Sequence, residues 1–443
     1  MKTIAFILAF AMSTNIAFAF WPFSSKPKKS DDIPIYKPDL PTPQNLKTYD
    51  KPKEEDKVSV ENLERIAKQG NHNAQLAIGK CYFDGRGGVK RNYKKAVKYF
   101  KMAADQGNPT AMFNLGLCYD GGFGVKQDLD TALDYYSKAA EQGVPEAMQK
   151  IASVAEQKGD FIVALKYFRR LAAQGDPKSQ RKAAVFLLNG VGKPNSPTEI
   201  TDLLMAAASQ GDRRAQVHLA DCYQKGQGVP INYDEMFNWL MLAAQEGDAE
   251  AQTKLGFCYE KGFGTVKNTD VAFQWYKLAA KADYAPAIVS LGDCYKNGVG
   301  VSASPQKAIE AYQQAAKKGD FIAEFRVGQA YLDGYVLEQN PEKALSFIQA
   351  AANQNFAPAL FLMGRFNEEG VATPKDPQAA YRFYLKAAEL KEPEAMAKLG
   401  ECLLTGFGTA QNKEEARKWL AQAATNGSKH ALNLIDEHFP EKQ

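Results

Sequence analysis

The chain has 443 residues, with 55 Lys and Arg against 51 Asp and Glu, so its formal net charge is +4 at pH 7. A charge this small on a chain this long provides no basic surface of the kind that holds phosphate backbones, which argues against nucleic-acid binding. The four histidines, at positions 72, 218, 430 and 438, share no zinc-ligand spacing with one another or with cysteine. We therefore predict neither a metal site nor a bound cofactor.

Residues 1–19 have the order of features that is typical of an export signal. One lysine precedes an apolar run over residues 4–12, and the segment ends Ala17-Phe18-Ala19. We predict a signal peptide cleaved after Ala19 and a mature protein in the periplasm or outside the cell. The alternative is an uncleaved membrane anchor, because Trp21 and Phe23 prolong the apolar character, but the run is short for a membrane span. After cleavage we expect no membrane span.

Residues 20–57 change composition sharply. Seven prolines stand among Lys, Asp and Glu residues, and no apolar period runs through them. This composition predicts a disordered or polyproline-like tether. It serves either as a spacer between the signal and the folded domain or as a docking segment.

Residues 71–427 repeat one unit about every 36 residues, and the copy at 248–282 is the clearest. Its apolar residues follow a helical period twice, first through Leu255 and Cys258 and then through Trp275 and Tyr276, with Gly262-Phe-Gly264 between the two runs. The positions equivalent to Cys258 are Cys81, Cys118, Val154, Phe186, Cys222, Cys294, Ala330, Phe366 and Cys402. A fixed period of this length indicates a helical solenoid. Residues 58–70 resemble the second half of a unit and residues 428–443 the first half, so we predict cap helices at both ends.

Short polar residues mark the start of each predicted second helix, where their side chains can accept bonds from unpaired amides. These residues are Asn92, Asp128, Asp160, Ser196, Asn232, Asn268, Ser304, Asn340, Asp376 and Asn412, and proline follows at 197, 305, 341 and 377. The third unit departs from the pattern, because its loop before Asp160 is four residues shorter and lacks the Gly-x-Gly turn. We expect its helices to be joined abruptly, with either a local change of curvature or no consequence.

The segments Ala111-x3-Leu115-Gly-x-Cys-Tyr119 and Ala251-x3-Leu255-Gly-x-Cys-Tyr259 resemble the Sel1-like repeat, a relative of the tetratricopeptide repeat. The resemblance covers residues 71 to about 426. It implies an all-α fold, a right-handed α-α superhelical solenoid of about ten helix pairs. Members of this family are mostly adaptors that hold other proteins, in the secretory pathway or, in bacteria, in the periplasm and in host interaction.

The six cysteines occupy one equivalent position in six different units. Equivalent helices in adjacent units should lie about 10 Å apart, which is too far for a disulfide. The secreted cysteine-rich members of the family carry two Cys per unit, and the second is missing here. We therefore predict no disulfide and interpret these cysteines as small buried hydrophobic residues.

Two segments match the Ser-x2-Lys pattern of β-lactam-active enzymes, Ser304-Pro-Gln-Lys307 and Ser25-Lys-Pro-Lys28. The first is a predicted helix cap and the second lies in the tether, and neither Ser-Asp-Asn nor Lys-Thr-Gly occurs. The glycine-rich turns follow no predicted strand and lack Gly-Lys-Ser/Thr, so we do not interpret them as phosphate sites. We predict no catalytic residue and no enzymatic activity.

With metal binding and catalysis set aside, the remaining candidate function is recognition of a partner at the protein surface. In a tetratricopeptide-like superhelix the first helices line the concave face, and the residue four before the Cys position should point away from the core. This column is polar and biased toward positive charge, and it reads Ala77, Asn114, Lys150, Lys182, His218, Lys254, Ser290, Arg326, Leu362 and Lys398. Of these we predict Asn114, Lys150, Lys182, His218, Lys254, Arg326 and Lys398 to contact a partner. Leu117 and Phe257, one residue before the Cys position, add apolar character. Such a face suits an acidic, extended peptide, although an ordinary solvated helix face would look similar.

The sequence thus predicts a monomeric, non-catalytic scaffold of the cell envelope or exterior that binds a partner protein or peptide in a concave groove. The alternative is a cell-wall or β-lactam-active hydrolase. An enzyme should show a pocket with convergent polar groups, whereas a scaffold should show a long shallow surface.

Overall fold

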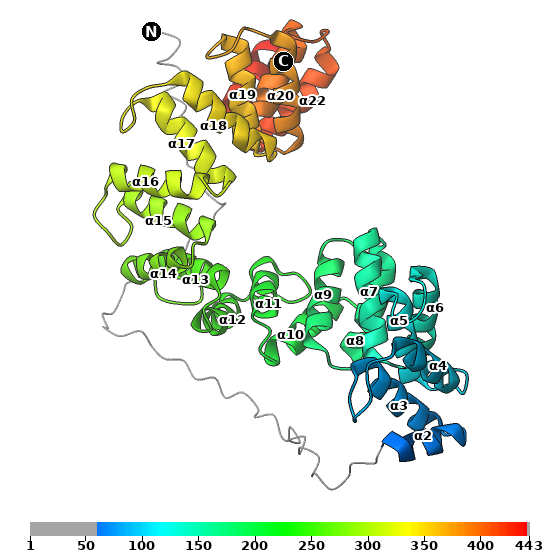
Figure 1. Ribbon diagram of the computed structural model, residues 1–443. Coiled ribbons are helices and arrows are strands. Elements are labelled where there is room, and N and C mark those ends of the chain that lie inside the picture. Colours follow the sequence, from blue (N-terminus) through cyan, green and yellow to red (C-terminus); the bar gives the residue numbers. More distant parts are fainter. Residues whose placement is uncertain (1–59, 441–443) are drawn as a thin grey trace. The chain divides into compact units, whose positions relative to one another are not determined.

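The computed structural model describes residues 60–440, and all of its regular structure is helical in this range (Figure 1). The predicted signal, the tether and the first two residues of the N-terminal cap segment lie outside the described residues. The helices are α2 (Val60–Lys68), α3 (His72–Asp84), α4 (Tyr93–Ala104), α5 (Pro109–Gly121), α6 (Leu129–Glu141), α7 (Pro145–Lys158), α8 (Phe161–Ala173), α9 (Pro177–Leu188), α10 (Glu199–Ser209), α11 (Arg213–Lys225), α12 (Tyr233–Gln245), α13 (Ala249–Lys261), α14 (Thr269–Lys281), α15 (Ala285–Asn297), α16 (Pro305–Ala316), α17 (Phe321–Asp333), α18 (Pro341–Asn353), α19 (Ala357–Glu369), α20 (Pro377–Glu389), α21 (Pro393–Thr405), α22 (Lys413–Thr425) and α23 (Lys429–His438).

In chain order the helices from α3 to α22 make ten two-helix repeats, which we number one to ten. Helix α2 lies in the segment predicted as the N-terminal cap, and α23 in the predicted C-terminal cap. Contacts divide the chain into two compact units, one that contains α2 to α11 and one that contains α12 to α23. Within each unit the helices pack on their neighbours in chain order. The helical-repeat solenoid predicted from the period is confirmed.

Side-chain caps start most of the helices, as the sequence predicts. Asp248 accepts the amide of Ala251 at the start of α13 (2.9 Å), and Asn268 accepts that of Val271 at the start of α14 (3.1 Å). The predicted caps at Asn92, Asp128, Asp160, Ser304, Asn340, Asp376 and Asn412 also accept amides of their own first turns. Each such bond satisfies an amide that has no partner within the helix.

The predicted cap at Ser196 is wrong, and so is the predicted first-turn position of Pro197. Helix α10 begins at Glu199, and its N-cap Thr198 makes no side-chain cap bond. The Glu199 carboxylate accepts two bonds from Arg169 on α8, at 2.7 and 2.9 Å, and it also accepts the Asn195 amide. These contacts hold the preceding loop in a non-helical conformation, so the helix starts later than local sequence indicates.

The third repeat joins its helices abruptly, as predicted. Helix α7 ends at Lys158 and α8 begins at Phe161, with only Gly159 and Asp160 between them. Gly159 takes a left-handed conformation (φ 77°), which lets the chain reverse in one step.

Glycine two residues before the Cys position lets the helices of one repeat approach closely. A Cβ atom on Gly256 would lie 2.7 Å from the ring of Tyr276 on the paired helix. The rings of Tyr136, Tyr312 and Tyr384 meet the equivalent glycines in the same way. Repeats three, four and five carry Ala152, Ala184 and Ala220 there, and their paired helices have Phe168, Leu204 and Leu240 in place of tyrosine.

The Gly-x-Gly turn of one repeat packs on the second helix of the repeat before it. A Cβ atom on Gly264 would lie 2.1 Å from the Tyr233 carbonyl oxygen, and Phe263 stacks on the Tyr233 ring with centroids 4.7 Å apart. The same close approach recurs between Gly124 and Tyr93, Gly300 and Thr269, and Gly408 and Pro377. These turns therefore fasten consecutive repeats to each other as well as connecting helices.

Candidate functional site

Three lysines of the column predicted on the first helices contact acids of the preceding repeat. Lys150 on α7 lies 3.0 Å from the Asp120 carboxylate of the preceding repeat. The same oxygen accepts the hydroxyl of Tyr136 from α6, also at 3.0 Å. Burial and the nearby Asp120 charge both raise the pKa of Tyr136, so its hydroxyl stays a donor. Three helices from two repeats thus meet at one carboxylate.

The ninth and tenth repeats contain the same arrangement with a further acid. Lys398 on α21 lies 3.0 Å from Glu368 and 3.0 Å from Glu401, and Tyr384 donates its hydroxyl to Glu368. Burial opposes the Lys398 charge, but the two carboxylates outweigh it and raise the lysine pKa. Glu401 also contacts His430 at 3.1 Å, and this bond, together with Lys398, lowers the pKa of Glu401 to about 2 against the opposing effect of burial.

Lys182 on α9 makes the equivalent contact across the short third repeat. Its ammonium lies 2.6 Å from Glu156 and 4.7 Å from the centroid of Phe168. Phe168 stands where repeats two, six, seven and nine have tyrosine, so a cation–π contact takes the place of the hydroxyl bond here. We call these three clusters the carboxylate ladder: Asp120 with Lys150, Glu156 with Lys182, and Glu368 with Lys398.

The acids of the carboxylate ladder were missed by sequence reasoning, although a signal for them exists. Each stands two residues after the Cys position of its repeat. Each precedes its lysine by 30 residues, or by 26 across the shortened repeat. Because that spacing joins two helices of different repeats, it carries meaning only once the stacking geometry is known.

The other residues predicted to contact a partner also have neighbours within the chain. The Asn114 amide donates to the Thr110 carbonyl, and Lys254 pairs with Glu250 one turn before it (2.9 Å). Arg326 and His218 are half-buried. Leu117 packs against the core of repeats two to four, and the Phe257 ring lies 5.7 Å from Phe263.

The charge of the predicted basic stripe is therefore largely balanced. Of its lysines, 150, 182, 254 and 398 all have a carboxylate within 3.0 Å. Leu362, at the equivalent position of repeat nine, is buried, so the column is not solvated along its whole length. Whether this face binds a partner stays a prediction.

Five of the six cysteines are buried and Cys81 is half-buried, and all six are free thiols. Burial raises the pKa of the Cys118, Cys258 and Cys402 thiols to about 12, and Asp221 adds to burial in raising that of Cys222 to about 11. Because the thiolate is the reactive form, these side chains are unsuited to nucleophilic chemistry at neutral pH.

We expect a disulfide reagent that reports thiolate release, used at pH 8 on the folded chain, to modify Cys81 first. The other five thiols should react about a hundredfold more slowly, because they are both buried and protonated. In denaturing urea all six should react together. Rapid reaction of all six in the folded protein would contradict the structure.

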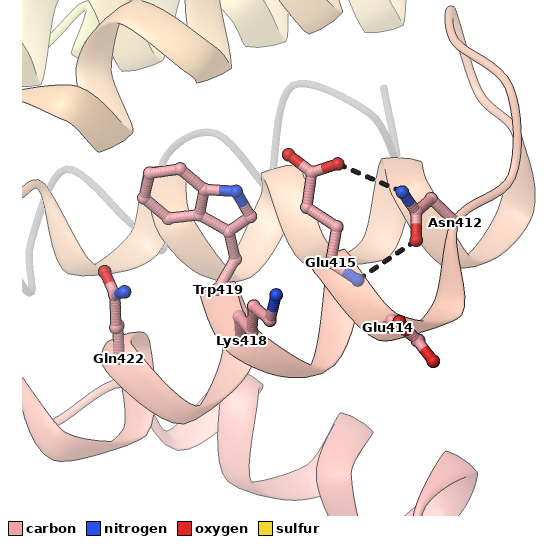
Figure 2. A pocket seen from close by; sticks show the side chains of 6 residues that line it. All are labelled: Asn412, Glu414, Glu415, Lys418, Trp419 and Gln422. Carbon is pink, nitrogen blue, oxygen red and sulfur yellow. Dashed lines mark hydrogen bonds between the residues drawn. The ribbon is translucent and has the colours of Figure 1, made fainter.

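A shallow pocket of about 360 Å³ lies on α22 (Figure 2). It is lined by Asn412, Glu414, Glu415, Lys418, Trp419 and Gln422. The Asn412 amide donates to the Glu415 carboxylate, and the Glu415 amide donates back to Asn412, both at 3.1 Å. These two polar groups therefore form a helix cap, and every lining residue comes from one helix or its cap.

Ser304 and Lys307 do not form a catalytic pair. The Ser304 hydroxyl caps α16 by accepting the Lys307 amide (3.4 Å). The Lys307 ammonium lies over the Tyr295 ring, 5.6 Å from its centroid. The second Ser-x2-Lys segment, Ser25 to Lys28, lies outside the described residues.

No helix within residues 60–440 is long and apolar enough to cross a membrane. No group of three or more His, Cys, Asp and Glu side chains is placed to hold a metal ion in the same range.

The sequence matches the profile of the Sel1 repeat at residues 72–108, 109–144, 146–176, 213–248, 249–284, 285–320, 322–356, 357–392 and 393–428. The fourth repeat, whose helix α10 begins late, is not among these matches.

The chain is 34% identical over 93 residues to HRD3A of Arabidopsis thaliana, an ERAD-associated E3 ubiquitin-protein ligase component. That match covers 20% of this chain and 14% of HRD3A, and a second match, to HRD3B, is 41% identical over 58 residues and covers 13% of this chain and 9% of HRD3B. Among solved structures, a protective antigen of uropathogenic Escherichia coli strains with an SLR fold is 27% identical, with a TM-score of 0.56, over 86% of this chain and 91% of that one.

Proposed function

The chain belongs to the Sel1 repeat family, and on this premise we propose that it is a non-catalytic adaptor that binds a partner protein along the first helices of its repeats. Sel1 repeat proteins generally mediate protein–protein interaction. The observation that supports the proposal most strongly is the repeat array itself. Because the repeats of each unit present equivalent first helices in succession, each unit offers an extended surface of the kind on which solenoid proteins bind partners.

The chemistry of the candidate sites supports a non-catalytic role. The pocket on α22 uses its Asn412 and Glu415 groups to cap a helix, and Ser304 serves the same purpose on α16. Burial and raised pKa values make the cysteine thiols weak nucleophiles. The described residues thus present no assembled nucleophile and base. No observation on the described residues favours the hydrolase alternative.

Because the charge of the first-helix face is largely balanced, the partner that we propose differs from the acidic peptide predicted from the sequence. A stripe of free lysines would select an acidic peptide, but the carboxylate ladder neutralises three of those lysines. We therefore propose recognition by mixed polar and apolar contacts, in which Leu117 and Phe257 provide apolar area and unpaired charge adds little. Export to the periplasm or cell exterior, supported by the signal pattern of residues 1–19, is part of the same proposal.

Site-specific photo-crosslinking tests the proposal. A photoreactive residue is placed at Lys80 or at Ser153, which are exposed and lie one residue before the Cys position on first helices. Matched controls carry it at Lys98 or Lys166, which are exposed on the second helices of the same two repeats. We expect one discrete protein adduct in envelope extract from the first-helix positions and none from the controls.

The salt dependence of the adduct separates charge from contact area. An adduct that survives a high salt concentration fits mixed contacts, whereas one lost at high salt restores the acidic-peptide hypothesis. If no protein is captured while wall fragments or a labelled β-lactam are retained, the adaptor proposal is wrong and the hydrolase alternative should be pursued.

A further inference from the structure

One junction of the repeat array has a cation where the carboxylate ladder has an acid. The ladder acids stand two residues after the Cys position, and in repeat seven this residue is Lys296, near the end of α15. The other repeats have Phe83, Asp120, Glu156, Leu188, Gln224, Glu260, Leu332, Glu368 and Leu404 there. Arg326 on α17 follows Lys296 by 30 residues, the spacing from Glu368 to Lys398. Two cations of adjacent repeats therefore take the places of an acid and its lysine.

The tyrosine of this junction has a different acceptor from its equivalents. In repeats two, six and nine the tyrosine hydroxyl donates to the acid two residues after the Cys position. In repeat seven, Tyr312 on α16 instead donates to Asp293 on α15, at 2.5 Å. Burial and the Asp293 charge raise the pKa of Tyr312, and the Arg326 charge opposes them, so Arg326 lies near this hydroxyl. Arg326 thus reaches the region where the ladder lysines meet their acids.

Lys296 and Arg326 lie near each other without a direct acidic partner. Although Lys296 is an exposed residue, partial burial of its ammonium lowers its pKa, and the Arg326 charge lowers it further. Asp293 and Asp333 oppose this effect, but neither acid forms an ion pair with the two cations within residues 60–440. The Nε–H of Arg326 is buried and has no acceptor in the same part of the chain. The lysines of the carboxylate ladder, in contrast, all have a carboxylate within 3.0 Å.

We propose that Lys296 and Arg326, which we call the dibasic site, bind the side-chain carboxylate of a glutamate or aspartate on the partner protein. A carboxylate placed between the two cations makes a charge-assisted hydrogen bond with each and offsets their mutual repulsion. The exposed Lys296 is open to such a group. A side chain fits better than a chain end, because the first helices α13 and α19 of the same unit come before and after this junction, so an extended partner continues past it.

The inference rests on the proposed adaptor function and refines its partner at one point. At the carboxylate ladder the chain's own acids already meet the lysine charges, so an acid of the partner gains little there. At the dibasic site the same acid gains two direct contacts. One acidic residue at a fixed place in the partner therefore sets the register in which an extended segment lies on the repeats, while apolar contacts provide area.

Zero-length crosslinking to the full chain tests the dibasic site. The reagent is an acetylated, amidated peptide of glycine and serine with a single central glutamate, which a carbodiimide couples to nearby lysines that mass spectrometry then identifies. The matched control is Lys317 at the end of α16, an exposed lysine of the same unit that also forms no ion pair with the described residues. A neutral N-hydroxysuccinimide ester measures the intrinsic reactivity of each amine, and each peptide yield is divided by it. We expect the corrected yield at Lys296 to exceed that at Lys317 about tenfold or more.

Arg326→Asn is the decisive variant, because it removes the second cation and keeps the amine that reacts. It introduces the residue that repeat two has at the equivalent position, Asn114, so the variant should fold, which circular dichroism checks. We expect the corrected yield at Lys296 to fall about tenfold in Arg326→Asn, since one hydrogen bond between charged groups is lost. Arg326→Lys keeps the charge and should retain most of the yield.

Equal corrected yields at Lys296 and Lys317 would overturn the inference, and so would an unchanged yield at Lys296 in Arg326→Asn. A second peptide carries its only carboxylate at the chain end, and stronger coupling of this peptide would show that the side-chain occupant is the wrong choice. The photo-crosslinks at Lys80 and Ser153 report separately, because both residues lie in the unit that contains α2 to α11. Crosslinks without selective coupling at Lys296 would refute the dibasic site alone, whereas selective coupling without crosslinks would refute the first-helix adaptor surface alone.

Discussion

Replacing Gly264 with alanine is expected to destabilise the unit that contains α12 to α23 by about 2–5 kcal/mol. Two costs add at this position. Gly264 has a φ of +64°, a conformation that costs a residue with a side chain about 1–2 kcal/mol. In addition, the new Cβ atom would lie 2.1 Å from the Tyr233 carbonyl oxygen, so one repeat must shift away from the next, at roughly 1–3 kcal/mol.

Gly247→Ala in the same unit is the matched control. Gly247 has a φ of +86°, but no atom lies within 4 Å of the position that its Cβ would take. Its replacement should therefore cost only the backbone term, about 1–2 kcal/mol. Urea unfolding followed by tryptophan fluorescence compares the two variants. Equal losses of stability would show that the Gly-x-Gly turn does not fasten the repeats.

The pair of glycines shows what the sequence alone can predict and where it stops. The 36-residue period, the glycines after first helices and the cap residues together identify helices and turns, because these depend on local backbone and hydrogen-bonding preferences. Gly264 could be predicted to lie in a tight turn. Its contact with Tyr233 could not, because that contact depends on how one repeat stacks on the previous one.

The same limit, that local sequence does not show how repeats stack, explains which predictions the structure corrects. Ser196 has the right chemistry for a cap, but Arg169 from the preceding repeat binds Glu199 and moves the helix start. Lys150 and Lys398 are at positions that were expected to be free, but their charges meet acids from a neighbouring repeat. In each case a residue of one repeat decides the conformation or charge of another, and local patterns contain no information on that pairing.

Removing the Glu368 carboxylate is expected to have the second large effect. In Glu368→Leu the hydroxyl of Tyr384 loses its acceptor inside the core, where the tyrosine is completely buried, and Lys398 keeps only Glu401. A buried donor without a partner costs about 1–3 kcal/mol and a half-buried cation that loses a carboxylate adds to it, so we expect a total of about 2–4 kcal/mol. Tyr384→Phe removes the donor as well, so the double variant should lose less stability than the sum of the two single variants.

Glu260→Leu tests the same tyrosine contact without a lysine from the next repeat, since the lysine that pairs with Glu260 is its own neighbour Lys261. Glu260 accepts the Tyr276 hydroxyl at 3.0 Å, as Glu368 accepts that of Tyr384, but the next repeat has Ser290 where Lys398 stands. If the carboxylate ladder joins repeats, urea unfolding should show a larger loss of stability for Glu368→Leu than for Glu260→Leu. The loss of stability measured for Lys398→Met alone should equal most of that difference. Equal losses would mean that Lys398 contributes nothing to stability and is available to a partner. A larger loss for Glu368→Leu would show that Lys398 stabilises the junction between repeats nine and ten. If a Lys398 variant then bound a partner more weakly, the first explanation would be a loosened junction, and the loss of a direct contact with the partner would come second.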